Sequence, residues 1–324
     1  MSRKKIVVTG GAGFIGSAVV WRLNEIGRDD ILIVDRMDET DKWKNLAPLK
    51  FTDYIDAYYF IEDFDDFKDA KAVFHLGACS STTERDADFM FRNNYQYTQD
   101  LARWSVMHGI RFIYASSAAT YGDGSLGMDD GTDDLDKLRP LNVYGYSKHL
   151  FDTYAARNGM FDKIVGLKYF NVFGPNEDHK GDMRSLVNKA FDQINSTGKL
   201  QLFKSHNPEY KDGEFGRDFV YVKDAVDMTL HFLENDASGL FNIGSGRMQT
   251  WNQLATAIFA ALDLPDNVEF VDMPEHLRDR YQYRTEADLT RLRDTGYADE
   301  PTTLDAAVAD YVRNYLIPGK HLGD

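Results

Sequence analysis

Residues 9–16 of the chain read Thr9-Gly-Gly-Ala-Gly-Phe-Ile-Gly16, and this stretch decides the fold. Its glycines form the pattern Gly-x-x-Gly-x-x-Gly at Gly10, Gly13 and Gly16, directly after the apolar run Ile-Val-Val. Residues 14–27 continue with the apolar periodicity of a helix. Glycines let the backbone approach a pyrophosphate, and the N-terminus of a helix offers free N–H groups and positive potential. The stretch therefore predicts a dinucleotide-binding βαβ unit.

An acidic residue stands where such a unit contacts the adenosine ribose. Asp35 ends the apolar run 31–34, about 20 residues after the glycine turn. A carboxylate at this place binds the free ribose hydroxyls of NAD. Arg36 and Lys42 lie close by, however, and either cation suits the extra phosphate of NADP. The residues alone leave both cofactors open.

Further apolar runs recur along the first half of the chain and alternate with helical stretches. The runs are residues 72–76, 111–115 and 163–167, and the helical stretches include 86–108 and 144–158. Strands that are apolar on both faces and alternate with helices are typical of a buried parallel sheet. The sequence predicts an α/β fold with a doubly wound, Rossmann-type parallel sheet.

The pattern loosens after about residue 170. Residues 174–184 and 203–217 have loop composition, while 218–235 read as one more strand and helix. We expect a dinucleotide-binding domain made of residues 1–170 plus about 218–240. The remaining segments, about 171–217 plus 241–324, are expected to form a smaller mixed α/β domain that binds the substrate.

Composition limits the partners and the setting. The chain has 324 residues, of which 43% are hydrophobic, and a formal net charge of -15. This charge argues against a general nucleic-acid or membrane surface, and no run approaches the roughly 18 apolar residues of a membrane span. The single cysteine, Cys79, excludes an intrachain disulfide and a cysteine zinc site, so we expect no metal and a cytoplasmic protein. The acidic run Asp129–Asp136 is expected to be a solvated loop.

A tyrosine and a lysine form the candidate proton-handling pair. In the stretch Asn-Val-Tyr-Gly-Tyr-Ser-Lys, Tyr144 and Lys148 are four residues apart and share one face of a helix, whereas Tyr146 points elsewhere. A nearby ammonium favours the phenolate, so Lys148 is expected to lower the pKa of Tyr144. Ser117 ends an earlier predicted strand, whose carboxyl end faces the cofactor crevice. Its hydroxyl would contact the alcohol or carbonyl that reacts.

These motifs together resemble the extended short-chain dehydrogenase/reductase superfamily. Nucleotide-sugar members of the superfamily also carry segments like Arg217–Val222 and Phe241–Gly246. Five further stretches resemble one family within it, the ADP-glyceromanno-heptose 6-epimerases: Gly77–Glu84, Asn93–Tyr97, Ser116–Gly122, Tyr169–Pro175 and His179–Met183. The resemblance covers essentially the whole chain.

The resemblance implies an isomerase that binds NADP tightly and recycles it. Oxidation at the sixth carbon of the heptose gives a keto intermediate, which is reduced on its opposite face; the product is a precursor of the lipopolysaccharide core. Tyr144 would serve one side and Lys180 the other, with Ser117 holding the oxygen and Lys148 holding the nicotinamide ribose. The family often forms homo-oligomers, commonly pentamers.

The resemblance also carries binding residues onto this chain. For the cofactor these are Gly10, Gly13, Phe14, Ile15, Gly16, Asp35, Arg36, Lys42, Leu76, Gly77, Ala78, Cys79, Ser80, Asn94, Lys148, Val172 and Lys180. For the ADP-heptose they are Asn171, Asp182, Lys189, Phe203, Lys204, Ser205, His206, Arg217 and Tyr281. Arg217 is the best candidate for the diphosphate because its planar fork suits phosphate oxygens, and Arg280 is a possible helper. The family usually has a small residue where this chain has Asp182.

Three other functions are compatible with parts of this pattern. A 4,6-dehydratase needs an Asp-Glu pair after the strand-end serine, where this chain has Ala118 and Ala119. A UDP-hexose 4-epimerase uses one tyrosine and does not require Lys180. A non-catalytic NAD(P)-sensing protein typically loses the tyrosine or the lysine, and both are present here.

Overall fold

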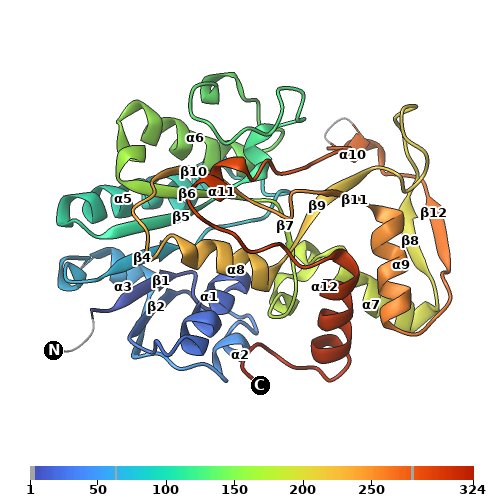
Figure 1. The fold of residues 1–324 in the computed structure, drawn as a ribbon, viewed down its shortest axis with the longest axis horizontal. Helices are drawn as coiled ribbons and strands as arrows, with labels where there is room; N and C mark the ends of the chain where they lie inside the picture. The colour runs from blue at the N-terminus through green and yellow to red at the C-terminus, as the bar shows by residue number, and fades with distance from the viewer. Residues whose placement is uncertain (1–3, 63, 279–280) are drawn as a thin grey trace.

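The computed structural model describes residues 4–62, 64–278 and 281–324. Its centre is a seven-stranded sheet in the order β10-β6-β5-β4-β1-β2-β3, in which every neighbouring pair is parallel (Figure 1). The strands are β1 Ile6–Thr9, β2 Ile31–Asp35, β3 Asp53–Asp56, β4 Ala72–His75, β5 Arg111–Ser117, β6 Ile164–Tyr169 and β10 Gly239–Ile243. This architecture confirms the predicted doubly wound α/β fold.

Helices cover both faces of the sheet. They are α1 Phe14–Glu25, α2 Trp43–Leu46, α3 Ala57–Glu62, α4 Ala87–Met90, α5 Tyr97–His108, α6 Val143–Arg157 and α8 Val222–His231, with a π-helical turn at Phe91–Gln96. Alternate residues of β1 face opposite sides, so Val8 packs with α1 and α8 while Val7 packs with α5 and α6. All residues of β1, β2, β4 and β6 are buried, which explains their continuous apolar runs.

Smaller elements complete the chain beside the carboxyl ends of the sheet. A three-stranded sheet has the order β11-β9-β7, and a two-stranded parallel sheet pairs β12 with β8. These strands are β7 Asn171–Phe173, β8 Leu200–Phe203, β9 Gly216–Tyr221, β11 Met248–Thr250 and β12 Val268–Val271. The helices are α7 Leu186–Thr197, α9 Trp251–Ala261, α10 Glu275–Arg278, α11 Thr290–Asp294 and α12 Leu304–Tyr311. Single 3₁₀ turns lie at Phe64–Phe67, Ala118–Tyr121, Leu135–Lys137, Met160–Asp162 and Asp178–Met183, and a π-helical turn lies at Val312–Leu316.

Two strands of the large sheet were not predicted, and one of them bears on the expected domain division. β3 lies at one edge of the large sheet and is only half-buried, so it lacks an apolar run. β10 lies at the other edge and crosses the expected boundary at residue 240. β9, by contrast, is paired in the three-stranded sheet rather than in the large one. The division into two domains stays a proposal.

The acidic run at residues 129–136 is not simply a solvated loop, and this expectation was wrong for one of its carboxylates. Asp130 is 2% exposed. Its carboxylate accepts a hydrogen bond of 2.7 Å from the backbone N–H of Asn242 in β10 and lies 3.3 Å from Nε of Arg291. A buried carboxylate with these partners fixes the run against the edge of the sheet.

Candidate active site

The glycine turn between β1 and α1 has the geometry of a phosphate-binding loop. Gly10 has a φ of 68°, and a Cβ added there would lie 2.6 Å from the Cα of Gly77. A Cβ on Gly16 would lie 2.0 Å from the carbonyl oxygen of Gly10. α1 begins at Phe14, and no side chain caps its first N–H groups. The turn is thus closely packed against Gly77, and the first N–H groups of α1 have no side-chain cap, as an anion site requires.

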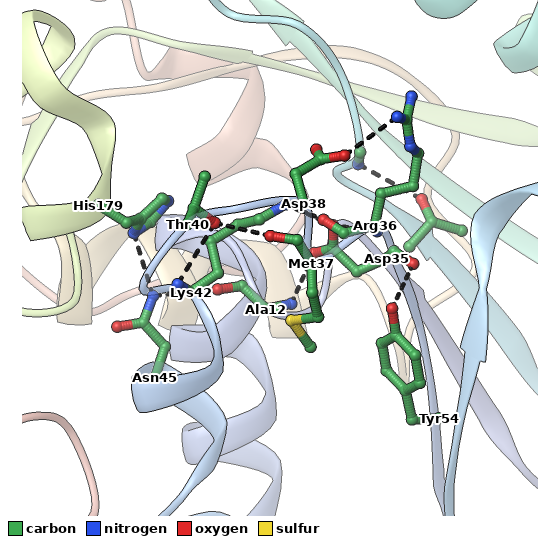
Figure 2. Close-up of polar contacts among 12 residues, drawn as sticks. Ala12, Asp35, Arg36, Met37, Asp38, Thr40, Lys42, Asn45, Tyr54 and His179 are labelled. Atoms are coloured by element: carbon green, nitrogen blue, oxygen red, sulfur yellow. Dashed lines mark hydrogen bonds and ion pairs between the residues drawn. The ribbon is translucent and has the colours of Figure 1, made fainter.

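Figure 2 shows the polar contacts at the end of β2, where the adenosine ribose is expected. The carboxylate of Asp35 accepts hydrogen bonds from the backbone N–H groups of Ala12 at 2.8 Å and Arg36 at 2.7 Å. It also pairs with Nζ of Lys42 at 3.0 Å, and that Nζ donates to the carbonyl oxygen of Arg36 as well. The Arg36 guanidinium instead pairs with Asp38 at 3.0 Å. Lys42 is therefore the cation directly beside Asp35.

A cavity of about 730 Å³ connects this end of β2 with the second part of the chain. It opens at the carboxyl ends of the parallel strands, which is where doubly wound sheets bind their ligands. The predicted residues that line it are Gly10, Gly13, Phe14, Ile15, Gly16, Asp35, Lys42, Leu76, Gly77, Ala78, Ser80, Ser117, Tyr144, Lys148, Asn171, Val172, Lys180, Lys189, Phe203 and Tyr281. The predicted residues that are not part of this lining are Arg36, Cys79, Asn94, Asp182, Lys204, Ser205, His206 and Arg217.

Asn94 lies behind the cavity wall and shapes it. It sits in the π-helical turn Phe91–Gln96, and such turns are frequent at functional sites. Its side chain accepts from the backbone N–H of Cys79 and donates to the carbonyl oxygen of the same residue, both at 2.9 Å, and it also donates to Oγ of Ser147 at 3.0 Å. Asn94 therefore fixes the backbone of the loop whose neighbouring residues Ala78 and Ser80 face the cavity.

The start of α6 brings Tyr144 and Lys148 to the cavity. The Asn142 side chain caps the helix by accepting from the N–H of Gly145 at 2.8 Å, so the helix begins early enough to contain both residues. Tyr144 and Lys148 then share the face that lines the cavity. Tyr146 is 45% exposed and packs against the ring of Phe91, with the centroids 5.9 Å apart.

The titration behaviour of this pair differs from the expectation. Burial raises the pKa of the Tyr144 phenol, and a hydrogen bond with Ser117 acts in the opposite direction. Burial also lowers the pKa of Lys148 to about 8. The Lys148 ammonium donates to the carbonyl oxygen of Ala115 at 2.8 Å. The expected lowering of the Tyr144 pKa by Lys148 was wrong, because desolvation dominates and the ammonium is directed at the end of β5.

Lys180 reaches the same cavity from the 3₁₀ turn Asp178–Met183. Its Nζ lies 5.0 Å from the ring centroid of Phe14, the first residue of α1. Burial lowers the pKa of Lys180, the carboxylate of Glu177 acts against this, and the ammonium of Lys189 adds to it. A lysine that acts as a base must lose its proton part of the time, and burial of this kind favours that. The fold thus places a partly desolvated lysine beside the glycine turn. This lysine lines the same cavity as Tyr144.

Three aromatic rings line the cavity near the guanidinium of Arg217, which is not itself part of the lining. Arg217 is 8% exposed, and its guanidinium carbon lies 4.9 Å from the ring centroid of Tyr281 and 5.9 Å from that of Trp251. Phe215 packs edge-on against Tyr281, at 5.5 Å between centroids. Burial lowers the pKa of Arg217, and its guanidinium donates to the carbonyl oxygen of Gly216 at 3.0 Å. Trp251 and Phe215 also line the cavity and were not predicted from the sequence.

Further predicted substrate residues have protein partners; Lys189 belongs to α7, whereas Lys204, Ser205 and His206 lie in the loop after β8. Nζ of Lys204 is 3.2 Å from Asp272, and the N–H of Ser205 donates to Asp212 at 2.8 Å. Nε2 of His206 accepts from a backbone N–H at 3.3 Å, and Nζ of Lys189 donates to the carbonyl oxygen of Asp182 at 3.2 Å. The possible helper Arg280 lies outside the described residues.

Two negative findings hold for the described part of the chain. Residues 4–62, 64–278 and 281–324 contain no group of three or more His, Cys, Asp or Glu side chains that could hold a metal ion. Within the same ranges, no helix has the length and apolarity needed to cross a membrane.

The parallel sheet, the glycine turn and the cavity at the carboxyl ends of the strands define a Rossmann-type, dinucleotide-dependent protein. The chain belongs to the NAD dependent epimerase/dehydratase family, whose sequence model matches residues 6–244. It therefore binds a nicotinamide cofactor.

Individual relatives match almost the entire chain. A protein from Nitratidesulfovibrio vulgaris named ADP-L-glycero-D-manno-heptose-6-epimerase is 51% identical, over 96% of this chain and 97% of its own. A protein of the same name from Fusobacterium nucleatum is 48% identical, over 96% and 98%. The crystal structure of the Helicobacter pylori ADP-L-glycero-D-manno-heptose-6-epimerase is 26% identical, covers 96% of both chains and superposes with a TM-score of 0.81.

Proposed function

We propose that the protein is an isomerase that converts ADP-D-glycero-D-manno-heptose into its L-glycero epimer at C6, a step toward the lipopolysaccharide core. The names of the relatives at 51% and 48% identity support this substrate. The observation that carries the proposal is the placement of Tyr144 and Lys180. Tyr144 comes from α6 and Lys180 from the 3₁₀ turn Asp178–Met183, and both line one cavity beside the glycine turn.

The proposed chemistry is a transient oxidation at C6 followed by reduction on the opposite face. A bound nicotinamide supplies this chemistry by accepting a hydride from C6 and giving it back. Tyr144 serves as the acid/base group on one face of C6 and Lys180 serves on the other face, so that inversion needs no single residue to reach both sides. Ser117 hydrogen-bonds the reacting oxygen, and Lys148 holds the nicotinamide ribose.

The preferred cofactor in this proposal is NADP, with NAD as the alternative. Lys42 lies 3.0 Å from Asp35 at the end of β2, where an extra ribose phosphate would stand. An ammonium at this place offsets both the Asp35 carboxylate and the charge of the phosphate. Arg36 is nearby but is paired with Asp38.

The second part of the chain is proposed to hold the ADP moiety of the substrate. Arg217 is the only predicted substrate residue of the described chain whose guanidinium or ammonium is buried between aromatic rings. A desolvated guanidinium binds phosphate oxygens strongly, because little hydration is lost on binding. Arg217 lies behind the lining of the cavity, and Tyr281, Phe203 and Asn171 line it and complete the proposed contacts.

The wider setting is also proposed rather than observed. We infer the two-domain division stated above, a homo-oligomer of the kind common in the resembled family, and a cytoplasmic location. Ala118 and Ala119 occupy the places where a 4,6-dehydratase needs its acid and base, so elimination of water is not favoured. A UDP-hexose 4-epimerase is the main alternative.

The test is conversion of each ADP-heptose epimer by the purified protein, followed by NMR without added cofactor. Interconversion of the two epimers, with UDP-galactose left unchanged, is the expected result. Conversion of UDP-galactose alone would replace the proposal with the hexose epimerase.

A paired substitution tests the second base. Lys180→Ala is expected to slow turnover by about 10²–10⁴-fold, the usual contribution of an acid/base group. Lys199 is an exposed lysine at 3.6 Å from Glu269 and outside the cavity, so Lys199→Ala should leave turnover unchanged and serves as the control. Normal turnover of Lys180→Ala would rule out the two-base scheme.

A further inference from the structure

Asn45, near the end of α2, is a buried junction between three segments that are far apart in the sequence. Figure 2 shows its contact with His179. It is 2% exposed. Its Nδ2 donates to the carbonyl oxygens of Ala12 in the glycine turn, at 3.0 Å, and of Asn176, at 3.1 Å. Its Oδ1 faces Nδ1 of His321 at 3.1 Å. The two carbonyl oxygens can only accept, so they fix which end of the amide is the NH₂ group.

The same NH₂ group fixes the state of His179. Nδ1 of His179 lies 3.2 Å from Nδ2 of Asn45. The NH₂ group has two hydrogens and three neighbouring acceptors, so His179 shares a donor with one of the two carbonyl oxygens. Because the group does not accept, a proton on Nδ1 would point at an N–H, and this favours the ring with Nδ1 unprotonated. In the neutral imidazole the proton then sits on Nε2. Among the residues that the structure describes, no hydrogen-bond partner is recorded for this Nε2.

His179 faces the cofactor cavity in this neutral form. It is one of the residues that line the cavity, as are Lys42 and Lys180. Burial lowers the pKa of His179 to about 4, and the ammonium groups of Lys42 and Lys180 act in the same direction. The carboxylates of Asp35 and Asp178 oppose this shift. His179 therefore stays uncharged near neutral pH and offers one N–H donor.

We propose that His179 is a cofactor-binding residue that donates a hydrogen bond from Nε2 to a phosphate oxygen of the bound dinucleotide. It was not among the residues that the family resemblance assigned. The glycine turn, whose Ala12 is held by the same Asn45, places the cofactor phosphates at this wall of the cavity. Lys42 and Lys180, which line the same cavity, supply the charge that attracts the anion, and His179 supplies a directional donor. The proposal rests on the nicotinamide cofactor of the proposed function and not on the identity of the sugar.

Two substitutions separate the phosphate contact from the structural role. His179→Asn keeps an oxygen near the place of Nδ1, where it accepts from Asn45, and loses the donor at Nε2. His179→Gln instead carries an amide N–H near the place of Nε2. We expect His179→Asn to weaken binding of NADP⁺ to the nucleotide-free protein by about tenfold or more, as for a lost hydrogen bond to a charged group. His179→Gln should stay within about threefold of the wild type.

Calorimetry with NADP⁺ and with NAD⁺ measures these affinities, and thermal unfolding checks that each variant is folded. A loss with NADP⁺ alone places the contact at the ribose phosphate, and an equal loss with both places it at the pyrophosphate. Wild-type affinity of His179→Asn for both dinucleotides would overturn the inference while leaving the proposed function intact. If the wild type bound neither dinucleotide, both would fail.

Discussion

Tyr144 and Tyr146 are two residues apart on one helix, yet only Tyr144 lines the cavity. We predict that Tyr144→Phe lowers turnover of ADP-heptose by about 10²–10⁴-fold, because the phenol is the acid/base group on one face of the sugar. Tyr146→Phe is the matched control and should keep wild-type turnover, since its ring is 45% exposed beside Phe91. Equal losses in the two variants, measured by initial rates in the NMR assay, would contradict the assignment.

The sequence predicted that these side chains share a helix face, but it did not predict the pKa of Tyr144. Four-residue spacing on a helix is a local property, so the pairing of Tyr144 with Lys148 on one face was predictable. The pKa of Tyr144 depends on how deeply the rest of the chain buries it, and burial raises that pKa. Asn45 and His179 escaped prediction for a related reason. Their contact joins residues 134 positions apart, and no local pattern marks it.

At the scale of the element, the glycine turn is the most constrained connection. In Gly16→Ala the new Cβ would stand 2.0 Å from the carbonyl oxygen of Gly10, so the turn must move. We predict a lower melting temperature and a loss of NADP⁺ affinity, both measurable on the purified variant.

Gly27 provides the comparison, because it follows the same helix α1 and has room for an added Cβ. Gly27 has a φ of 75°, and nothing lies within 4 Å of an added Cβ. Gly27→Ala should therefore destabilise the protein by only about 1 kcal/mol, through backbone strain, and leave NADP⁺ affinity unchanged. If Gly16→Ala bound NADP⁺ as tightly as Gly27→Ala, the turn would not be the phosphate site.

The segment around Asp130 gives a prediction about pH. Burial raises the pKa of Asp130 to about 6, above the ordinary value of 3.8 for an exposed carboxyl. The folded state then holds its proton to higher pH than the unfolded state does, so this residue makes the protein less stable as pH rises from about 4 to about 6. Asp130→Asn lacks this effect while an oxygen remains for the N–H of Asn242.

The difference in melting temperature, Asp130→Asn minus wild type, is therefore expected to become more positive between pH 4.5 and pH 7.5. Scanning calorimetry at both pH values measures it, and comparing the two proteins at each pH cancels the titration of other groups. A difference that became more negative over this range would show that the Arg291 ion pair, at 3.3 Å, outweighs the cost of burial.

Elements with strong local patterns were predictable, and elements defined by their neighbours were not. β1, β2 and β4 are buried on both faces and appear as apolar runs, so the parallel sheet was predicted correctly. β3 is an edge strand with polar residues at both ends, and its sequence gives no run. The acidic run at 129–136 was expected to be solvated because its charges are visible in the sequence. The backbone N–H of Asn242, which donates to the buried Asp130 carboxylate, cannot be recognised from the sequence.

At the scale of the whole molecule, the cavity depends on segments that the chain brings together from both of its parts. The glycine turn, the start of α6 and the 3₁₀ turn of Lys180 meet there, with Arg217, Tyr281 and Trp251 at or near its far end. The family motifs indicated most of these segments. The packing of Arg217 between two rings required the three-dimensional arrangement, since Trp251 follows a strand that pairs antiparallel with the strand of Arg217.

The central claim is that one cavity epimerises the sugar by removing the hydrogen at C6 and returning it to the other face. The most direct test is to run the reaction on unlabelled ADP-heptose in D₂O and to examine C6 of the product by NMR and mass spectrometry. A hydrogen carried by the bound nicotinamide does not exchange with solvent, so the product is expected to contain no deuterium at C6. Deuterium at C6 in proportion to turnover would mean deprotonation and reprotonation of the carbon, and would contradict the oxidation–reduction mechanism.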